Sequence, residues 1–238
     1  MQVLPFNMAQ FDEATHTYTA GGISLISVTT LLSSWFKKFN PDETIRMMKS
    51  KPSWPQSKYA ALTDQEIKDQ WASDGKEAAT QGTRLHAAIE EYFKTKTQTL
   101  DTVEMQQFLR FVQLKQPTML EVEYRVFDTE WKLAGTIDGV ATHGDELDLY
   151  DWKRCKDMTS SYGYAIYPGL THVPSSNYWK YSLQLNLYRA LLEKQGRRVH
   201  AMYIVCFHSE HLDFQLYEVG KMDVETILNT RCHKEPCG

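Results

Sequence analysis

Glu146-Leu147-Asp148-Leu149-Tyr150-Asp151-Trp152-Lys153-Arg154 alternates between apolar and polar side chains in the way that a β-strand requires. One face of this predicted strand carries Leu147, Leu149, Asp151 and Lys153, and the other carries Asp148, Tyr150 and Trp152. The first face begins apolar and ends with a carboxylate and an ammonium, which can both face one small volume. An isolated Asp-x-Lys tripeptide more often marks a strand whose polar end emerges into solvent. The neighbouring elements decide between these two interpretations.

Two further strands precede this stretch, at residues 119–127 and 131–140, and the third spans residues 145–153. Their short turns at residues 128–130 and 143–144 predict an antiparallel meander. On the middle strand, Asp138 lies among small and apolar residues. That is an unusual setting for a carboxylate unless something binds it.

Helical periodicity dominates the residues before the meander. After a hairpin at residues 11–28, helix starts are predicted at Ser27 or Thr29, at Asn40-Pro41 and at the capping box Thr63–Glu66, whose helix runs to about Ala79. A helix through residues 82–93 follows, in which His86 and Glu90 stack four residues apart beside an apolar stripe. Such a histidine, taken by itself, is more often structural than a ligand. Residues 101–115 form another amphipathic helix.

The residues after the meander alternate between loop, helix and strand. Residues 157–178 are the longest structureless run, and a run of this length beside a suspected site is usually functional or disordered. Residues 177–194 form a helix on which Gln184 and Tyr188 are four residues apart. A buried strand at 199–207, an edge strand at 213–219 and a closing helix at 222–231 complete the chain.

Composition is that of an ordinary globular protein: 238 residues, 42% hydrophobic and 24% charged, with a net charge of −4. The missing basic surplus argues mildly against a protein that coats DNA, but it permits an enzyme with a local basic groove. No apolar run approaches the roughly 20 residues that cross a bilayer, and no targeting segment is visible, so an intracellular location is expected. The four cysteines form no Cys-x-x-Cys pair and are interpreted as reduced thiols.

Four motifs follow one another in chain order: Gly-Thr-x-x-His-x-x-x-Glu at 82–90, Gly-x-Ile-Asp-Gly at 135–139, Asp-x-Lys at 151–153 and Gln-x-x-x-Tyr at 184–188. Each is weak, but four in this order on these element types are specific. The chain therefore resembles the PD-(D/E)XK nuclease superfamily, in particular its RecB-like exonuclease branch and the single-domain relatives of the mitochondrial genome maintenance exonuclease. His16-x-Tyr18 and Ser-Val-Thr at 27–29 are similar to small viral and phage members.

This resemblance implies an α/β (α+β) fold, with the central mixed β-sheet of an αβββαβ core flanked by helices. It implies a single domain, residues 1–238, with an N-terminal hairpin and helical region at 11–115 and a catalytic core at 80–219. Metal ligands are implied at His86, Asp138, Asp151 and the backbone carbonyl of Trp152. Lys153 is the implied catalytic lysine, Gln184 and Tyr188 orient the site, and Glu90 supports the ligands.

Nucleic-acid contacts are expected from several weaker signals. The hydroxyls of Ser27, Thr29 and Thr30 at a helix start suit a phosphate, although a plain helix cap is the commoner role. Basic residues interleaved with aromatics at 35–60, among them Lys58, suit single-stranded nucleic acid but also fit a solvated helical face. Further contacts are expected at Arg84, at Tyr162 and Tyr164 in the long loop, and at Tyr188.

The expected cofactor is Mg²⁺ or Mn²⁺, because oxygen-rich sites bind these ions and one imidazole shifts preference modestly toward Mn²⁺. Iron–sulfur branches of the family place a cysteine before the histidine helix. Here no cysteine precedes Cys155, so no iron–sulfur cluster is expected.

The expected partner is DNA that is single-stranded or has free ends, with no membrane, and the expected state is a monomer acting as an exonuclease. Three alternatives stay open: a structure-specific endonuclease, a non-catalytic single-strand binder, and an unrelated α/β protein in which the motifs are accidental.

Overall fold

The computed structural model describes residues 10–12 and 17–234, except for the side chains of residues 232–234. Its elements are β1 (Gln10–Asp12), β2 (Thr17–Ala20), β3 (Ile23–Ser27), α1 (Val28–Ser34), α2 (Pro41–Lys49), a 3₁₀ turn (Trp54–Gln56), α3 (Asp64–Thr95), α4 (Val103–Lys115), β4 (Met119–Asp128), β5 (Leu133–His143), β6 (Glu146–Arg154), α5 (Asn177–Lys194), β7 (Val199–Phe207), β8 (Gln215–Glu218) and α6 (Glu225–Lys234). The sequence-based bounds of α5 and β7 agree with the structure, and most others differ by a few residues at the ends.

All of these strands belong to one eight-stranded mixed sheet, in the order β1-β2-β3-β5-β6-β7-β8, with β4 paired to β5 off this path. The strands β4, β5 and β6 form the expected antiparallel meander, and β7 pairs parallel to β6 after the crossover through α5. The succession α3-β4-β5-β6-α5-β7 is the αβββαβ core, so the predicted fold class is confirmed.

The strand β5 has a gap in its pairing. Its first residues pair with β3 at Leu133 and Ala134, and its last residues pair with β6 from Gly139 onward. Since β4 pairs with both of these stretches, β3 and β6 lie on the other edge of β5. Residues 135–138 have no strand partner on that edge in the described part of the chain, so the sheet opens there.

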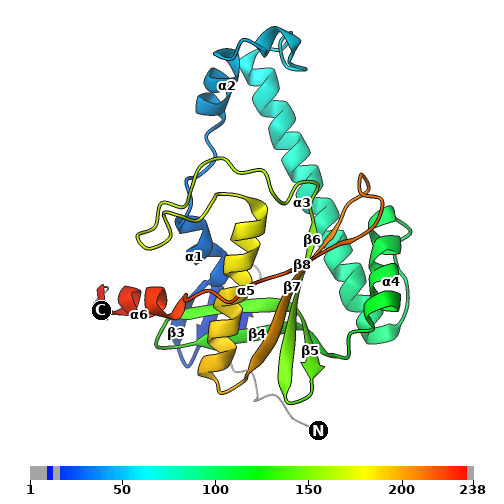
Figure 1. Ribbon diagram of the computed structural model, residues 1–238, viewed down its shortest axis with the longest axis vertical. Coiled ribbons are helices and arrows are strands. Elements are labelled where there is room, and N and C mark those ends of the chain that lie inside the picture. The colour runs from blue at the N-terminus through cyan, green and yellow to red at the C-terminus, as the bar shows by residue number, and fades with distance from the viewer. Residues whose placement is uncertain (1–9, 13–16, 235–238) are drawn as a thin grey trace.

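Two hydrophobic clusters cover the two faces of the sheet. Leu147 and Leu149 belong to the cluster formed with α1, α5 and α6, whereas Tyr150 and Trp152 belong to the cluster formed with α3 and α4. Figure 1 shows α5 crossing one face of the sheet while α3 and α4 lie to its side. The alternation of apolar side chains along residues 146–154 therefore serves both faces, as period-two patterning predicts.

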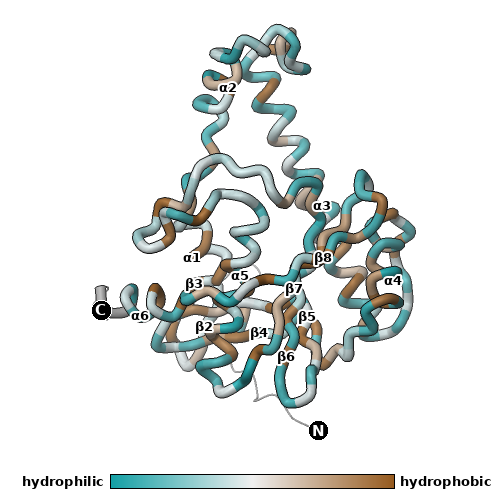
Figure 2. The backbone as a smooth tube through the Cα atoms, viewed as in Figure 1, coloured by the Kyte–Doolittle hydropathy of each residue, from teal (hydrophilic) through white to brown (hydrophobic). Residues whose placement is uncertain are grey.

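The helix α3 corrects one sequence-based prediction. It is expected to end near Ala79, but it continues without a break from Asp64 to Thr95 over 32 residues. A Cβ added at Gly82 would meet nothing within 4 Å. The Thr80 and Thr83 hydroxyls donate to the carbonyl oxygens four residues earlier, so these polar side chains are accommodated within the continuous helix. The first half of α3 projects with α2 beyond the sheet (Figure 1), and Figure 2 shows that this arm is mostly hydrophilic.

The segment between β6 and α5 contains no helix or strand, as the sequence predicts, but it packs against the rest of the protein. Residues 155–176 bury Ala165, Leu170 and Val173, and the Ile166 N–H donates to the Trp35 carbonyl at 2.7 Å. Tyr178, assigned to this loop from sequence, lies in the first turn of α5.

The hairpin β2–β3 forms as predicted around Gly21 and Gly22, although its expected residues Thr15 and His16 fall outside the described residues. Within the described part of the chain, no helix combines the length and apolar character that a membrane span needs.

Candidate active site

Asp138 lies at the opening in the sheet and contacts two other elements. Its Oδ2 accepts a hydrogen bond from the backbone N–H of Trp152 on β6 at 2.8 Å. The same oxygen lies 3.7 Å from Nδ1 of His86 on α3 and 3.8 Å from Nζ of Lys153. The predicted residues His86, Asp138 and Lys153 therefore converge from one helix and two strands.

Asp151 and Lys153 form the second half of this cluster. Lys153 Nζ donates to Asp151 Oδ1 at 2.6 Å, and Gln184 Nε2 from α5 donates to the same oxygen at 3.2 Å. Gln184 Nε2 also lies 3.2 Å from the Tyr188 hydroxyl. The Gln-x-x-x-Tyr motif thus holds the Asp151 carboxylate from the face of the sheet that α5 covers.

Burial and charge set the protonation of this cluster. Burial raises the pKa of the Asp151 carboxyl to about 7, against the lowering effect of the Lys153 ammonium. Burial by itself lowers the pKa of Lys153, but the charges of Asp151 and Asp138 raise it above its ordinary value, so the lysine stays charged. Burial also lowers the pKa of His86, against the opposing effect of Asp138, and this favours the neutral imidazole that binds metals.

The two glycines of the Gly-x-Ile-Asp-Gly motif make room for aromatic rings. A Cβ built on Gly135 would lie 2.6 Å from Cε1 of Tyr188, and one built on Gly139 would lie 2.7 Å from Cε of Met119 and 2.9 Å from Cζ2 of Trp152. These distances are shorter than side-chain contacts allow. The motif therefore has glycines on both sides of Asp138 because neighbouring side chains fill that space.

We expect Gly135→Ala to lower the free energy of unfolding by about 1–3 kcal/mol, because its methyl group overpacks the buried Tyr188 ring. Urea denaturation measures the change. The matched control is Gly75→Ala in the middle of α3, where nothing lies within 4 Å of the built Cβ. That substitution should stabilise the protein by up to about 1 kcal/mol through helix propensity. Equal effects of the two substitutions would contradict the packing argument.

Glu123 on β4 was not among the residues predicted for the site. One ligand atom each from His86, Glu123 and Asp138 lies within 4.8 Å of the others. Burial raises the pKa of Glu123 to about 7, and the charges of Asp138 and Glu90 add to the rise. The alternating pattern of residues 119–127 does not predict that Glu123 joins the site. Its position in the site depends on which residue of β5 lies opposite it.

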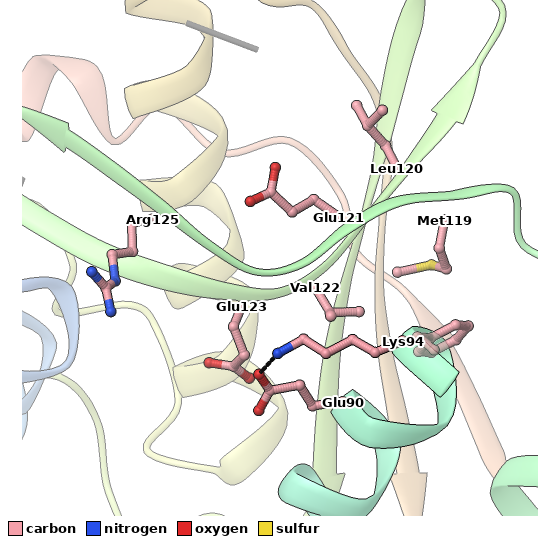
Figure 3. Close-up of a pocket in the computed structure, with 9 residues that line it drawn as sticks. Glu90, Lys94, Met119, Leu120, Glu121, Val122, Glu123 and Arg125 are labelled. Atoms are coloured by element: carbon pink, nitrogen blue, oxygen red, sulfur yellow. Dashed lines mark hydrogen bonds and ion pairs between the residues drawn. The ribbon is translucent and has the colours of Figure 1, made fainter. Parts of the chain in front are cut away.

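Glu90 lies next to the group of His86, Glu123 and Asp138 but is not part of it. Its carboxylate forms an ion pair with Lys94 one turn along α3, and Figure 3 shows Glu90 and Glu123 close together in an open pocket that Lys94 also lines. Glu90 influences the site through its charge on Glu123. Its predicted supporting role stays a prediction.

The residues present fit a divalent cation. Asp151 Oδ2 is buried and has no hydrogen-bond partner among the described residues. A buried carboxylate oxygen without a partner is costly, and a metal ion would satisfy it. The donor set of carboxylates with one imidazole suits Mg²⁺ or Mn²⁺. His86, Asp138, Asp151 and the Trp152 carbonyl are the residues that would hold the ion.

The predicted nucleic-acid contacts are spread over several segments, and one of them, Tyr188, is buried. Ser27 caps α1 by accepting the Thr30 N–H at 3.0 Å, and its hydroxyl bonds those of Thr29 and Thr30, so the cap prediction holds. Tyr162 and Tyr164 expose 89% and 62% of their surface on the loop after β6. Arg84 on α3 and Lys58 before it are also exposed, and Lys58 Nζ lies 4.8 Å from the centre of the Tyr59 ring.

Comparison with known proteins gives one family. The family model of the PD-(D/E)XK nuclease superfamily matches residues 55–226. None of the curated proteins compared with the chain matches it.

Two solved structures show low similarity to the chain. One is described as the crystal structure of SSO0001, at 14% identity and a TM-score of 0.40, covering 88% of this chain and 73% of that one. The other is an alkaline exonuclease (LHK-Exo) from Laribacter hongkongensis, at 14% identity and a TM-score of 0.35, covering 64% and 76%. Both TM-scores are too low to support an inference about function.

Proposed function

Because the chain belongs to the PD-(D/E)XK nuclease superfamily, we propose that it is a metal-dependent exonuclease of the RecB-like branch, which hydrolyses single-stranded or flap DNA from free ends. The observation that supports this best is the convergence of Asp138, Asp151 and Lys153 at the opening of the sheet, with His86 alongside. A carboxylate pair and an imidazole can hold a divalent cation, and an ammonium can stabilise charge on a phosphate, and both functions favour phosphodiester hydrolysis.

Hydrolysis of a phosphodiester needs a nucleophile derived from water and stabilisation of charge on the phosphate oxygens. A bound divalent cation supplies both, by lowering the pKa of water and by neutralising the developing charge. Asp138 and Asp151 would hold this cation, and the Trp152 N–H fixes the Asp138 carboxylate by donating a hydrogen bond to it. A neutral His86 would add a nitrogen ligand without adding positive charge.

The ammonium group of Lys153 lies beside the carboxylates of Asp138 and Asp151. Its side chain is largely buried, with the ammonium 2.6 Å from Asp151 and 4.9 Å from the centre of the Tyr181 ring. An ammonium in this position can orient the attacking water or donate to the phosphate oxygens as their charge grows. Gln184 keeps Asp151 in place, and Tyr188 in turn keeps Gln184 in place.

A preference for unpaired DNA is supported by exposed aromatic side chains on two segments of the chain. Tyr162 and Tyr164 lie on the loop that follows β6 directly, and exposed rings stack with unpaired bases. The arm of α2 and α3 adds a second set, in which the exposed Phe39 and the Tyr59 ring meet Trp71 edge-on, with Lys58 over Tyr59. Bases can stack on these rings only where the DNA is single-stranded or can be unpaired at an end.

The decisive experiment compares linear and covalently closed single-stranded DNA in the presence of Mg²⁺ or Mn²⁺. We expect the linear strand to be shortened progressively from one labelled end and the closed circle to survive. Asp151→Asn should abolish digestion, because the buried carboxylate is lost while the shape is kept. The matched control is Asp145→Asn in the β5–β6 turn, which should digest DNA like the parent.

Each alternative predicts a different result in the same assay. Cutting of the closed circle would identify a structure-specific endonuclease. Intact linear DNA that is nevertheless bound, with affinity falling steeply as salt rises, would identify a non-catalytic single-strand binder. Digestion by Asp151→Asn at the parental rate would refute the proposed active site.

A further inference from the structure

Another group of possible metal ligands lies toward the opposite end of β6 from Lys153. It consists of His143 at the end of β5, Asp148 on β6 and His200 on β7, and one ligand atom from each lies within 4.8 Å of the others. Asp148 and Asp151 are an odd number of residues apart on one strand, so their side chains leave opposite faces of the sheet. This His–Asp–His group is therefore separate from the candidate active site.

The register of three neighbouring strands brings these side chains together. Asp148 pairs with Ala141 on β5, and His143 lies two residues beyond Ala141, so it faces the same way. The pairing of β6 with β7 shifts between Leu147 and Asp148, which leaves His200 as one extra residue on β7. A bulge of this kind redirects a side chain. Here it brings His200 Nδ1 to 2.9 Å from Asp148 Oδ1.

The distances within the His–Asp–His group suit a tetrahedral metal ion. His143 Nδ1 lies 3.6 Å from Asp148 Oδ2, which is too long for a hydrogen bond. Two ligand atoms bound to tetrahedral Zn²⁺ at about 2.0–2.1 Å lie roughly 3.3–3.4 Å apart. The two imidazole rings are stacked, with their centroids 3.7 Å apart and their planes 6° from parallel. One nitrogen of each ring can therefore reach the same ion.

The carboxylate of Asp148 is buried and faces these two imidazoles. The residue is 9% exposed, and removing a carboxylate from water is costly unless its charge is compensated. Arg198, two residues before His200, pairs with Glu146 instead. Neutral imidazoles do not cancel the charge, and two imidazolium ions stacked 3.7 Å apart would repel each other. A divalent cation bound by all three residues would neutralise the carboxylate and leave both rings neutral.

We propose that His143, Asp148 and His200 bind Zn²⁺, and that the ion fastens β5, β6 and β7 together. Two imidazoles with one carboxylate favour a late transition-metal ion over Mg²⁺, which prefers oxygen ligands. The side chains of His143 and His200 are 55% and 41% exposed, so an ion can enter and keep water in its fourth position. This inference goes beyond the proposed nuclease function and does not depend on it.

Equilibrium dialysis of the full chain against Zn²⁺ counts the bound ions. Because the candidate active site can also hold Zn²⁺, the readout is the difference between variants. We expect His143→Ala and His200→Ala each to bind one ion per chain fewer than the parent. The matched control is His172→Ala, which removes an exposed histidine from the segment between β6 and α5. It should bind as many ions as the parent.

Co²⁺ in place of Zn²⁺ reports the geometry of the site. Tetrahedral Co²⁺ absorbs visible light strongly, whereas octahedral Co²⁺ in an oxygen-rich site absorbs weakly. We expect strong absorption in the parent and in His172→Ala, and its loss in His200→Ala. Zn²⁺ at about 100 times its Kd should also raise the Tm of the parent by roughly 5–10 °C more than that of His200→Ala.

The outcomes separate this inference from the proposed function. Equal Zn²⁺ counts in the parent and in both histidine variants would overturn the site, as would strong Co²⁺ absorption that survives His200→Ala. Loss of DNA digestion in Mg²⁺ by His200→Ala would overturn its separation from the active site. If the variants lose the ion while even the parent leaves every DNA substrate intact, the Zn²⁺ site stands and the proposed exonuclease fails alone.

Discussion

Lys153→Ala should reduce the rate of DNA hydrolysis by about 10²–10³-fold, the range seen when one preorganised donor to a developing oxyanion is removed. The ammonium lies 2.6 Å from Asp151 and 3.8 Å from Asp138, so its loss removes a positive charge from the point where the carboxylates converge. Time courses on an end-labelled single strand measure the effect. Binding of the strand, followed by fluorescence anisotropy, should change far less than the rate.

Stability must be separated from catalysis in this variant. Removing one partner of a buried ion pair is destabilising, and Asp151 is left without its lysine. Mn²⁺ should restore much of the lost stability, because the cation takes over neutralisation of the carboxylate. A variant that unfolds near the parental temperature in Mn²⁺ and still fails to cut DNA isolates the catalytic role. The control is Lys115→Ala, which removes one charge at the exposed end of α4.

Parental activity of Lys153→Ala would eliminate the lysine from the mechanism. A loss of activity that matches the loss of folded protein would assign it to structure instead.

Phe108→Ala should lower the free energy of unfolding by about 3–5 kcal/mol, the range for deleting a fully buried phenyl ring. Phe108 on α4 is completely buried, and its ring packs edge-on against Phe93, Trp152 and Phe207, with centroid distances of 5.5–6.2 Å. The cavity would therefore open beneath the strand that carries Asp151 and Lys153. Urea unfolding followed by tryptophan fluorescence measures the change.

Leu114→Ala on the same helix is the matched control. Leu114 is 61% exposed, and its truncation should alter stability by no more than about 0.5 kcal/mol. If both substitutions had the same effect, the cluster between α4 and the sheet would not be the source of stability that its packing indicates.

Local patterns were sufficient for most of the secondary structure. The capping residues Ser27, Asn40 and Thr63 begin α1, α2 and α3 as predicted, because a cap is a bond between residues three positions apart. The break expected near Ala79 was wrong for a related reason. A glycine weakens a helix without ending it, and no local signal shows that α3 continues past Gly82 toward the sheet.

The candidate site was likewise predicted only in part. The four motifs named His86, Asp138, Asp151, Lys153, Gln184 and Tyr188, and the structure brings these residues together from α3, β5, β6 and α5. Glu123 was not predicted because its importance comes from lying opposite Asp138. The register between β4 and β5 cannot be derived from the sequence of either strand alone. The two motif glycines were visible, but not the rings of Tyr188 and Trp152 that require them.

By itself, the sequence determined which residues form helices and strands, which faces are apolar, and which polar residues recur at family spacing. These properties depend on neighbours within a few positions, where periodicity and capping act. Only the tertiary structure decided the opening of the sheet along residues 135–138, the facing of Glu123 and Asp138, and the buried, unpartnered oxygen of Asp151. Those features come from contacts between segments far apart in the chain, whose register and burial are set by packing of the whole domain.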